Sequence, residues 1–352
     1  MSRRAATLAV ACVLVLVLAV AGTQMPVPYV ALMPGPTSNT LGTNDKGEPL
    51  IKIEGRQVYP DQGHLNFTTV TYRGGPGSRL DLFSALQGWL DGDVAIVPEE
   101  TLFPENESQE QVDQENTQQM ENSQRSAEAA ALIQLGIAFP VKIMVDSVQK
   151  GLPADGKLRP GDQITAVNGA PMGWLDDVTG RMAKLKAGDQ VTLTYLRAGK
   201  EEKTTLTTVA SPDADSDRPV MGVVLRDDFV FPFKINISVG DVGGPSAGLM
   251  FSLAIVDKLT PGSLAGKTFI AGTGTITPKG EVGPIGGIQQ KMVAARRAGA
   301  TVFLTPEDNC EDAAKARPDG LRLVRADTLK NTVNAINAIN TGKGEVPTCK
   351  AG

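Results

Sequence analysis

The chain has 352 residues, which is enough for two domains or for one domain interrupted by another. Its apolar and charged fractions, 41% and 21%, are those of a globular protein without collagen-like or coiled-coil bias. A net charge of −5 without a long Lys/Arg run argues against nucleic acid as a partner. Three cysteines without CxxC spacing exclude a disulfide scaffold and do not suggest zinc, so we expect no metal and no cofactor.

The N-terminus predicts export. A basic segment at residues 2–4 precedes an uncharged apolar run over 5–22. Because flanking arginines favour the cytoplasmic side, we expect a cytoplasmic N-terminus and an extracytoplasmic remainder. The length of the run and the apolar residues that follow it favour an uncleaved, single-pass membrane anchor over 1–25. The alternative is a cleaved signal peptide, since Ala-Val-Ala at 19–21 fits a signal-peptidase site.

Outside the cytoplasm a Cys310–Cys349 disulfide is permitted. The sequence equally allows two unpaired thiols, and the spacing does not decide between them.

The first third of the chain combines an expected tether with a few expected elements. Residues 26–49 are rich in Pro, Gly, Asn and Thr, which predicts an extracytoplasmic tether with turns, continuing to about residue 60. The expected elements that follow are strands at 50–53 and 64–72, a short helix at 81–90, and a long helix within 99–135. The acidic, Gln-rich start of the long helix could instead be a mobile linker.

From residue 141 the pattern changes to short strands between Gly, Pro and Asp turns, at 141–148, 163–169 and 191–197. The expected sequel is a loop at 211–219, strands at 221–225 and 233–239, a helix at 246–259, a strand at 268–274, a helix from 288, a strand at 301–306, and closing helices. Strands and helices on both sides of the loop predict an α+β fold.

The stretch GGPSAGLMFS, residues 243–252, is a candidate nucleophile site. A tight turn precedes a helix that is apolar almost all round and is therefore expected to be buried. The backbone N–H groups of Ser246 and Ala247 and the helix dipole could stabilise an oxyanion. The alternative is that Ser246 caps its helix. The sequence is not GxSxG, and the single histidine, His64, is distant and is expected to be exposed or at a strand end.

Lys291 supplies a candidate base. A helix starting near Ile288 places one set of residues on an apolar face: Ile288, Lys291, Met292, Ala295 and Ala298. It places Gln290 and Arg297 on the opposite face. Because burial disfavours an ammonium ion, it would lower the pKa of Lys291 and let the neutral amine take a proton from a serine. The alternative is a lysine with a buried stem and a solvated head. Ser246 with Lys291 is a known histidine-free arrangement.

These stretches, with GTGTITPKGEVGPIGGIQQKMVAARRAGA and TVFLTPEDN, resemble the proteolytic domain of Lon proteases. The resemblance implies that Ser246 is the nucleophile, Lys291 the general base and Thr273 the threonine that orients the lysine. It also implies peptide-bond hydrolysis through an acyl-enzyme. One departure is Gly243, where ATP-dependent members usually carry an acid; the preceding acid here is Asp241.

Residues 151–169, GLPADGKLRPGDQITAVNG, resemble the most recognisable segment of PDZ domains, and we assign 133–210 to such a domain. PDZ domains bind an extended peptide as an added strand. The carboxylate-binding loop is poorly matched, with LGIA at 135–138 as the candidate. The alternative is a domain that packs on its neighbour and binds nothing.

Two earlier stretches, 64–75 and 118–132, resemble the opening strand and first helix of the Lon proteolytic domain. We therefore expect the PDZ domain to be inserted between 61–132 and 211–345 of the proteolytic domain, with a simple series of domains as the alternative.

The predicted function is that of an ATP-independent serine endopeptidase acting on unfolded or flexible extracytoplasmic protein segments. GSLAGKT at 262–268 lacks the first glycine of a P-loop, which argues against a nucleotide. The resemblance implies a homo-hexamer as the candidate assembly. The rival prediction is a non-catalytic, peptide-binding PDZ scaffold on a degenerate protease fold.

Overall fold

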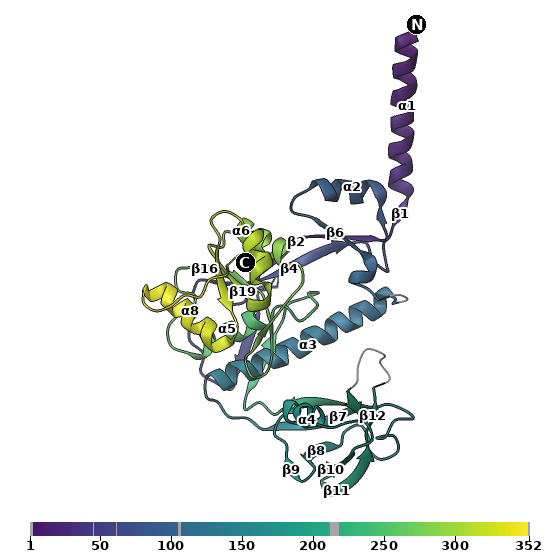
Figure 1. Cartoon of the computed structure of the whole chain (residues 1–352). Coiled ribbons are helices and arrows are strands. Elements are labelled where there is room, and N and C mark those ends of the chain that lie inside the picture. Colours follow the sequence, from purple (N-terminus) through teal and green to yellow (C-terminus); the bar gives the residue numbers. More distant parts are fainter. Residues whose placement is uncertain (1–2, 45, 61, 105–106, 212–217, 351–352) are drawn as a thin grey trace. The chain divides into compact units, whose positions relative to one another are not determined.

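The computed structural model describes residues 3–44, 46–60, 62–104, 107–211 and 218–350. The chain forms two compact units, one made of Met1–Ile137 with Phe233–Gly352 and the other of Ala138–Pro232. The second unit is thus one continuous stretch that interrupts the first (Figure 1). Helices and strands occur in both, so the expected α+β class is confirmed.

A six-stranded sheet in the order β20-β19-β16-β4-β2-β6 is the centre of the first unit (Figure 1). In that order the strands are Arg322–Ala326, Val302–Pro306, Phe269–Gly272, His64–Arg73, Tyr29–Asn39 and Ala95–Pro98. The first four strands are parallel, and β2 runs antiparallel to both β4 and β6. Because parallel strands end at the same edge of a sheet, the segments that follow β16 and β19 emerge together.

Two helices cover opposite faces of β4. They are α5 (Gly248–Leu259), which is buried along almost its whole length, and α6 (Ile288–Arg297). Phe251 of α5 packs on Phe67, whereas Gly287, just before α6, lies against Val70. Side chains three apart on a strand point to opposite faces, so the two helices approach the same strand from opposite sides.

The other helices of this unit are α1 (Arg3–Gln24), α2 (Leu82–Leu90), α3 (Gln109–Gln134), α7 (Cys310–Lys315) and α8 (Leu329–Thr341), with 3-10 turns at Glu99–Thr101 and Glu307–Asn309. Short strand pairs complete it: β1 (Pro26–Val27) with β5 (Leu80–Asp81), β3 (Ile51–Glu54) with β15 (Lys234–Ile237), and β17 (Thr275–Ile276) with β18 (Val282–Gly283). His64 begins β4, is exposed, and stacks on Phe269.

The second unit is a small antiparallel sheet in the order β11-β10-β8-β7-β14. The strands in that order are Lys200–Thr207, Gln190–Arg197, Gln163–Val167, Val141–Val148 and Val223–Phe229. β9 (Ala170–Pro171) pairs with β8, and β12 (Val209–Ala210) pairs with β13 (Pro219–Val220). The helix α4 (Leu175–Met182) completes the unit. Its core is mainly aliphatic and includes Ile143, Ile164, Val167, Val191 and Leu206.

The expectation of a tether over 26–60 is wrong. β2 occupies Tyr29–Asn39 and pairs along most of its length with β4. The Pro-Gly-Pro segment that predicted a turn, residues 34–36, lies where the β2–β4 register is irregular, and β6 pairs only with residues 29–32. Proline is tolerated there because that part of β2 is at the sheet edge, where a missing N–H costs no ladder hydrogen bond.

Two other expectations need correction. The strand expected at 221–225 within the proteolytic part is β14, which pairs with β7 in the second unit. The long helix begins at Gln109 instead of near residue 99, because Ser108 and Gln111 form a capping box. The strand β20 was not predicted, and residues 212–217 of the expected loop lie outside the described residues.

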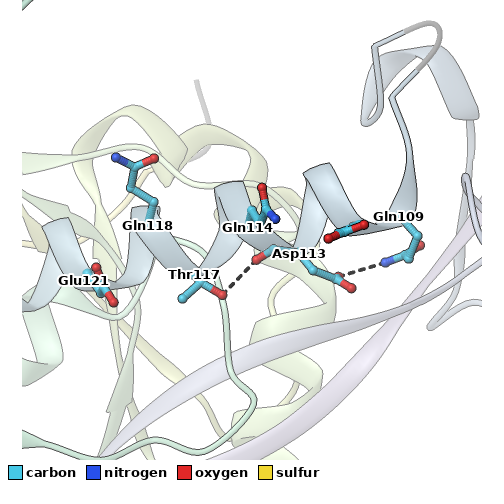
Figure 2. Close-up of a pocket in the computed structure, with 7 residues that line it drawn as sticks. Gln109, Asp113, Gln114, Thr117, Gln118 and Glu121 are labelled. Carbon is cyan, nitrogen blue, oxygen red and sulfur yellow. Dashed lines mark hydrogen bonds between the residues drawn. The ribbon is translucent and has the colours of Figure 1, made fainter. Parts of the chain in front are cut away.

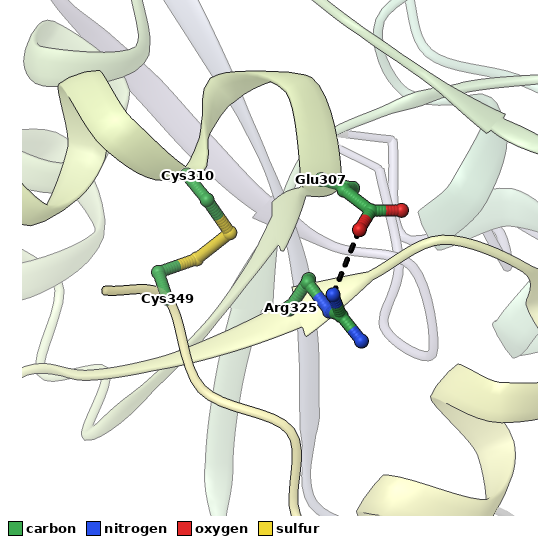
Figure 3. The surroundings of a disulfide bond; sticks show 4 residues. All are labelled: Glu307, Cys310, Arg325 and Cys349. Carbon is green, nitrogen blue, oxygen red and sulfur yellow. Dashed lines mark hydrogen bonds and ion pairs between the residues drawn. A yellow bond between two sulfur atoms is a disulfide. The ribbon is translucent and has the colours of Figure 1, made fainter. Parts of the chain in front are cut away.

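Cys310 and Cys349 form a disulfide, which decides between the two alternatives left open by the sequence (Figure 3). The bond ties the C-terminal segment to the start of α7 across 39 residues of sequence. The same segment is also held by Arg325, whose backbone N–H donates to Pro347 O. The guanidinium of Arg325 lies 2.7 Å from Glu307, which precedes α7.

A double Cys310→Ser, Cys349→Ser variant is expected to lose about 2–4 kcal/mol of stability, because the disulfide restricts the unfolded chain. Urea unfolding with and without reductant measures the loss, and reductant should shift the wild type but not the double variant. Cys12→Ser is the matched control, since Cys12 is an exposed free thiol in α1. Equal midpoints for the wild type and the double variant would contradict the expectation.

Candidate active site

Ser246, Thr273 and Lys291 lie together although they come from three separate segments. Ser246 precedes α5, Thr273 follows β16 directly, and Lys291 is in the first turn of α6. Lys291 Nζ lies 2.8 Å from Ser246 Oγ and 3.2 Å from Thr273 Oγ1. The Thr273 hydroxyl donates to Ser246 O at 2.9 Å. The site therefore forms where the end of a parallel strand meets the starts of two helices.

The turn before Ser246 is held by α3. The Gly244 N–H donates to Asn116 O at 3.0 Å, and the Ser123 hydroxyl donates to Pro245 O at 2.9 Å. Ser123 is almost fully buried. It belongs to a Gln-rich stretch in which we predicted no site residue. Its spacing of four residues from Ala127, which places both on one face of the helix, was the signal that could have identified it.

The end of β16 holds the other side of the same turn. The Gly274 N–H donates to Ser246 O at 2.8 Å, and the Leu249 N–H donates to Gly274 O at 3.1 Å. With Thr273, these contacts give the Ser246 carbonyl two donors. The backbone around Ser246 is thereby fixed, while its side chain remains half-buried.

The alternative in which Ser246 caps its helix is wrong. α5 begins at Gly248, two residues later than expected, and its N-cap is Ala247, without a side-chain capping bond. In the parts of the chain that the structure describes, neither the Ser246 nor the Ala247 N–H donates to a protein acceptor. The serine hydroxyl faces Lys291 instead.

Lys291 is buried, with 2% of its surface exposed. Removal from water disfavours the ammonium form and lowers the pKa of Lys291 to about 7. The amine therefore does not reach solvent in the way that the alternative required. Near neutral pH a large fraction is unprotonated and able to accept a proton.

The expected faces of α6 are partly wrong. Ile288, Met292 and Ala295 are buried as expected, but Ala298 is exposed and Gln290 is buried. Ala298 lies at the C-cap, where the helix ends. Gln290 is covered because the segment before β6 lies against it: Gln290 Nε2 contacts Asp93 O at 3.5 Å, and the Asp93 carboxylate also pairs with Arg297.

Asn309 fixes the approach to α6. Its side chain accepts from the Ile285 N–H at 2.9 Å and donates to Ile285 O at 3.0 Å. These two bonds hold the Pro-Ile-Gly-Gly turn that precedes Lys291. Asn309 lies in the TVFLTPEDN stretch, which the sequence identified only as part of a resemblance, with no role for this residue.

Gly243 has a steric explanation. A Cβ at this position would come within 2.7 Å of Asn116 Cβ on α3. An acid of the kind usual in ATP-dependent Lon proteases would therefore require α3 to move. Asp241, the acid that precedes it, is exposed.

A cavity of about 670 Å³ that is largely open to solvent lies along one side of α3 and is lined by Gln109, Glu110, Asp113, Gln114, Thr117, Gln118 and Glu121 (Figure 2). Asp113 is hydrogen-bonded within the helix: its carboxylate accepts from Gln109 Nε2, and its backbone carbonyl accepts from the Thr117 hydroxyl. None of Ser246, Thr273 and Lys291 lines this cavity. Within the described ranges, no three His, Cys, Asp or Glu residues are grouped so as to hold a metal ion.

Comparison with known families assigns both parts of the chain. Residues 234–337 match the Lon protease (S16) C-terminal proteolytic domain, and residues 112–208 match the PDZ domain. The PDZ match begins within α3, in the first compact unit.

Similar proteins are bacterial Lon proteases. Lon protease 1 of Bacillus subtilis is 35% identical over 112 residues, which cover 30% of this chain and 14% of that protein. The Lon protease of Halothermothrix orenii is 46% identical over 92 residues, covering 25% and 12%, and that of Vibrio parahaemolyticus is 33% identical over 151 residues, covering 39% and 19%. The chain therefore spans less than a fifth of the length of these relatives.

A solved PDZ domain of an SdrC-like protein from Listeria monocytogenes is 26% identical, covers 24% of this chain and 85% of that chain, and has a TM-score of 0.22. The two family matches place a proteolytic domain of the Lon type and a PDZ domain in one chain. The chain contains a Lon-type proteolytic domain and a PDZ domain, so both resemblances seen in the sequence are confirmed.

A Lys291→Met variant is expected to be more stable than the wild type at neutral pH, by an amount that shrinks as the pH rises. The folded amine loses its proton near pH 7 and the unfolded amine near pH 10.5. Between these values the unfolded state binds more protons, so wild-type stability rises with pH. Below pH 7 the buried amine is charged, and the resulting loss of wild-type stability is complete and does not change with pH.

Urea midpoints at several pH values across that window measure the difference, with Lys330→Met, at an exposed site, as the control. Parallel pH dependences for Lys291→Met and the wild type would contradict the lowered pKa.

Proposed function

We propose that the chain is a membrane-anchored, ATP-independent serine endopeptidase in which Ser246 and Lys291 form the catalytic dyad. The observation that carries the proposal is the 2.8 Å separation of Lys291 Nζ and Ser246 Oγ at a buried amine whose pKa is lowered to about 7. The match to a Lon-type proteolytic domain supports the peptidase class. A nucleophile needs a base of suitable pKa within hydrogen-bond reach, and this pair meets both conditions.

In the proposed mechanism, neutral Lys291 takes the Ser246 proton as Oγ attacks the carbonyl carbon of the scissile bond. The resulting oxyanion accepts hydrogen bonds from the Ser246 and Ala247 N–H groups. Lysine then gives its proton to the leaving amine, and an ester to Ser246 remains. Water attacks this ester with Lys291 again as the base, which releases the acid and restores the serine.

Thr273 is proposed as a positioning residue. Its hydroxyl donates to Ser246 O, so its remaining lone pairs can accept from Lys291 Nζ. The amine is thereby directed toward Ser246 Oγ. Loss of this hydroxyl should reduce the rate less than loss of either dyad member.

The anchor and its topology rest on α1. This helix has 22 residues, is strongly apolar and has no buried part, which fits a membrane span or a signal sequence. We favour a span with the catalytic part outside the cytoplasm, since Arg3 and Arg4 precede the apolar run. Without an unfoldase, the substrates would be unfolded segments, tails or loops. A homo-hexamer remains the proposed assembly.

We infer that the PDZ domain is inserted within the proteolytic domain, over about 138–232. The division of the first compact unit into two parts of the chain supports this inference. We no longer assign the carboxylate loop to LGIA at 135–138, because Leu135 caps the end of α3 and residues 135–137 belong to the first unit.

We propose β14 as the strand to which a peptide adds. Within the described residues β14 pairs on one side only, with β7, and so forms an edge of the sheet. α4 lies beside it, with the Leu175 N–H donating to Asp227 Oδ1 at 2.9 Å. An edge strand next to a helix offers backbone groups for strand addition and a groove for alternate side chains.

Ser246→Ala and Lys291→Ala are each expected to lower cleavage of unfolded casein at least about 10³-fold, and Thr273→Val by a smaller factor. Ser78→Ala and Lys330→Ala, at exposed sites, are the controls and should retain activity. Addition of ATP should leave the rate unchanged. Equal cleavage by all variants would refute the dyad, and the absence of cleavage by the wild type would favour the non-catalytic scaffold.

Peptide binding is expected to slow backbone amide exchange in β14 but not in β11, the opposite edge of the same sheet. Hydrogen exchange of the Ser246→Ala protein, with a peptide selected from a library of free C-termini, measures this difference. β11 is an internal control, because it also pairs on one side only in the described structure. Protection of β11 instead of β14 would contradict the assignment.

A further inference from the structure

The helix α2 presents its large apolar side chains to solvent. Phe83, Leu86, Trp89 and Leu90 are 51%, 48%, 72% and 89% exposed. Its buried residues are the small Ala85 and Gly88. A surface helix of a soluble domain normally buries its large apolar residues, so this distribution is inverted.

Packing keeps the large side chains outside. A Cβ on Gly88 would come within 2.7 Å of Ile96 Cδ1, so the inner face of the helix has no room for a larger side chain at that position. Positions 83, 86 and 90 recur at helical spacing and form one outer stripe, with Trp89 beside it. A contiguous exposed apolar stripe indicates an interaction surface.

This stripe lies at the end of α1. β1, which follows α1, pairs with β5, which precedes α2. The Leu82 N–H donates to Met25 O at 2.9 Å, and Gly22 lies against Phe83. In Figure 1, α2 lies beside the lower end of α1, to its left. The start of α2 is therefore attached directly to the last turn of the apolar helix.

We propose that α2 is an interfacial helix whose stripe of Phe83, Leu86, Trp89 and Leu90 inserts into the headgroup–acyl boundary of the bilayer that α1 spans. The proposal rests on the proposed anchor. α1 would be about 33 Å long, close to the thickness of a hydrocarbon core of about 30 Å, so its end and the attached α2 would reach the membrane surface. Tryptophan is enriched at that depth because its ring is amphipathic.

The chemistry of the stripe favours a lipid surface bound through apolar contact. α2 carries no Lys, Arg, Asp or Glu between Leu82 and Leu90. Binding should therefore depend on buried apolar area and little on anionic lipid or salt. Asp93, shortly after α2, contacts Gln290 and Arg297 of α6, so the membrane contact would be joined through one short segment to the helix that carries Lys291.

The test uses the two tryptophans of the chain, Trp89 and Trp174. Full-length Trp174→Phe protein is reconstituted in vesicles of phosphatidylethanolamine and phosphatidylglycerol. We expect blue-shifted Trp89 emission, strong quenching by lipids brominated near the glycerol end of their acyl chains, and weak quenching by aqueous iodide. The matched Trp89→Phe protein should be insensitive to brominated lipid.

Flotation of the vesicles separates the two proposals. Failure to co-float would overturn the anchor and the interfacial helix together. Co-flotation with Trp89 quenched by iodide and not by brominated lipid would overturn the interfacial helix alone. Protection from both quenchers would show that another protein surface covers the stripe and would also overturn it.

A second variant keeps the test independent of fluorescence at one site. A double Leu86→Glu, Leu90→Glu change in the Trp174→Phe protein should restore iodide access to Trp89 while flotation through α1 persists. Val58→Glu, at an exposed apolar side chain elsewhere in the unit, is the control and should change neither. Unaltered iodide access in the double variant would contradict the proposal.

Discussion

Removal of the Lys291 amine from water is the constraint on which the arrangement of the first unit depends. A buried amine is tolerated only when it is neutral or well partnered, and its two partners here are the hydroxyls of Ser246 and Thr273. Each partner belongs to a segment that is distant in sequence. The surrounding structure must therefore hold three backbones in a fixed relation to one amine.

The contacts that hold these backbones come from segments that precede and follow the second unit in the sequence. α3, which precedes that unit, fixes the turn before Ser246 through Asn116 and Ser123. β16 and Asn309, which follow it, fix Ser246 O and the start of α6. The family match to the proteolytic domain covers 234–337 and so omits α3 and β4. The contacts of α3 with the turn before Ser246 support the proposal that the two parts form one domain.

The proposed activities use three different kinds of contact. Peptide hydrolysis would use a desolvated amine and fixed backbone donors, where low polarity strengthens each hydrogen bond. Peptide capture would use the backbone of a strand at a sheet edge, and membrane attachment would use exposed apolar area. The last two are features that an isolated soluble domain normally limits, because open edges and apolar stripes promote aggregation.

The sequence by itself determined the elements whose residues repeat with a clear period, and it indicated candidate site residues near the ends of those elements. The strand 64–72, the helix from Ile288 and the Ser246 turn could all be predicted, because periodicity and glycine-rich turns act over a few residues. The same local pattern brought out Lys291, as a charged residue in an apolar stripe. The resemblance to Lon proteases then indicated Thr273, which no local pattern distinguishes.

Only the tertiary structure decided which face was covered and which strand paired with which. It turned the Pro-rich segment 29–39 into a sheet strand, assigned 223–229 to the second unit, buried Gln290 beneath the Asp93 segment and joined Cys310 to Cys349. In each case the partner lies far away in sequence. Local composition records the tendency of a segment to be a strand or helix, whereas pairing and burial depend on contacts that exist only after the chain has folded.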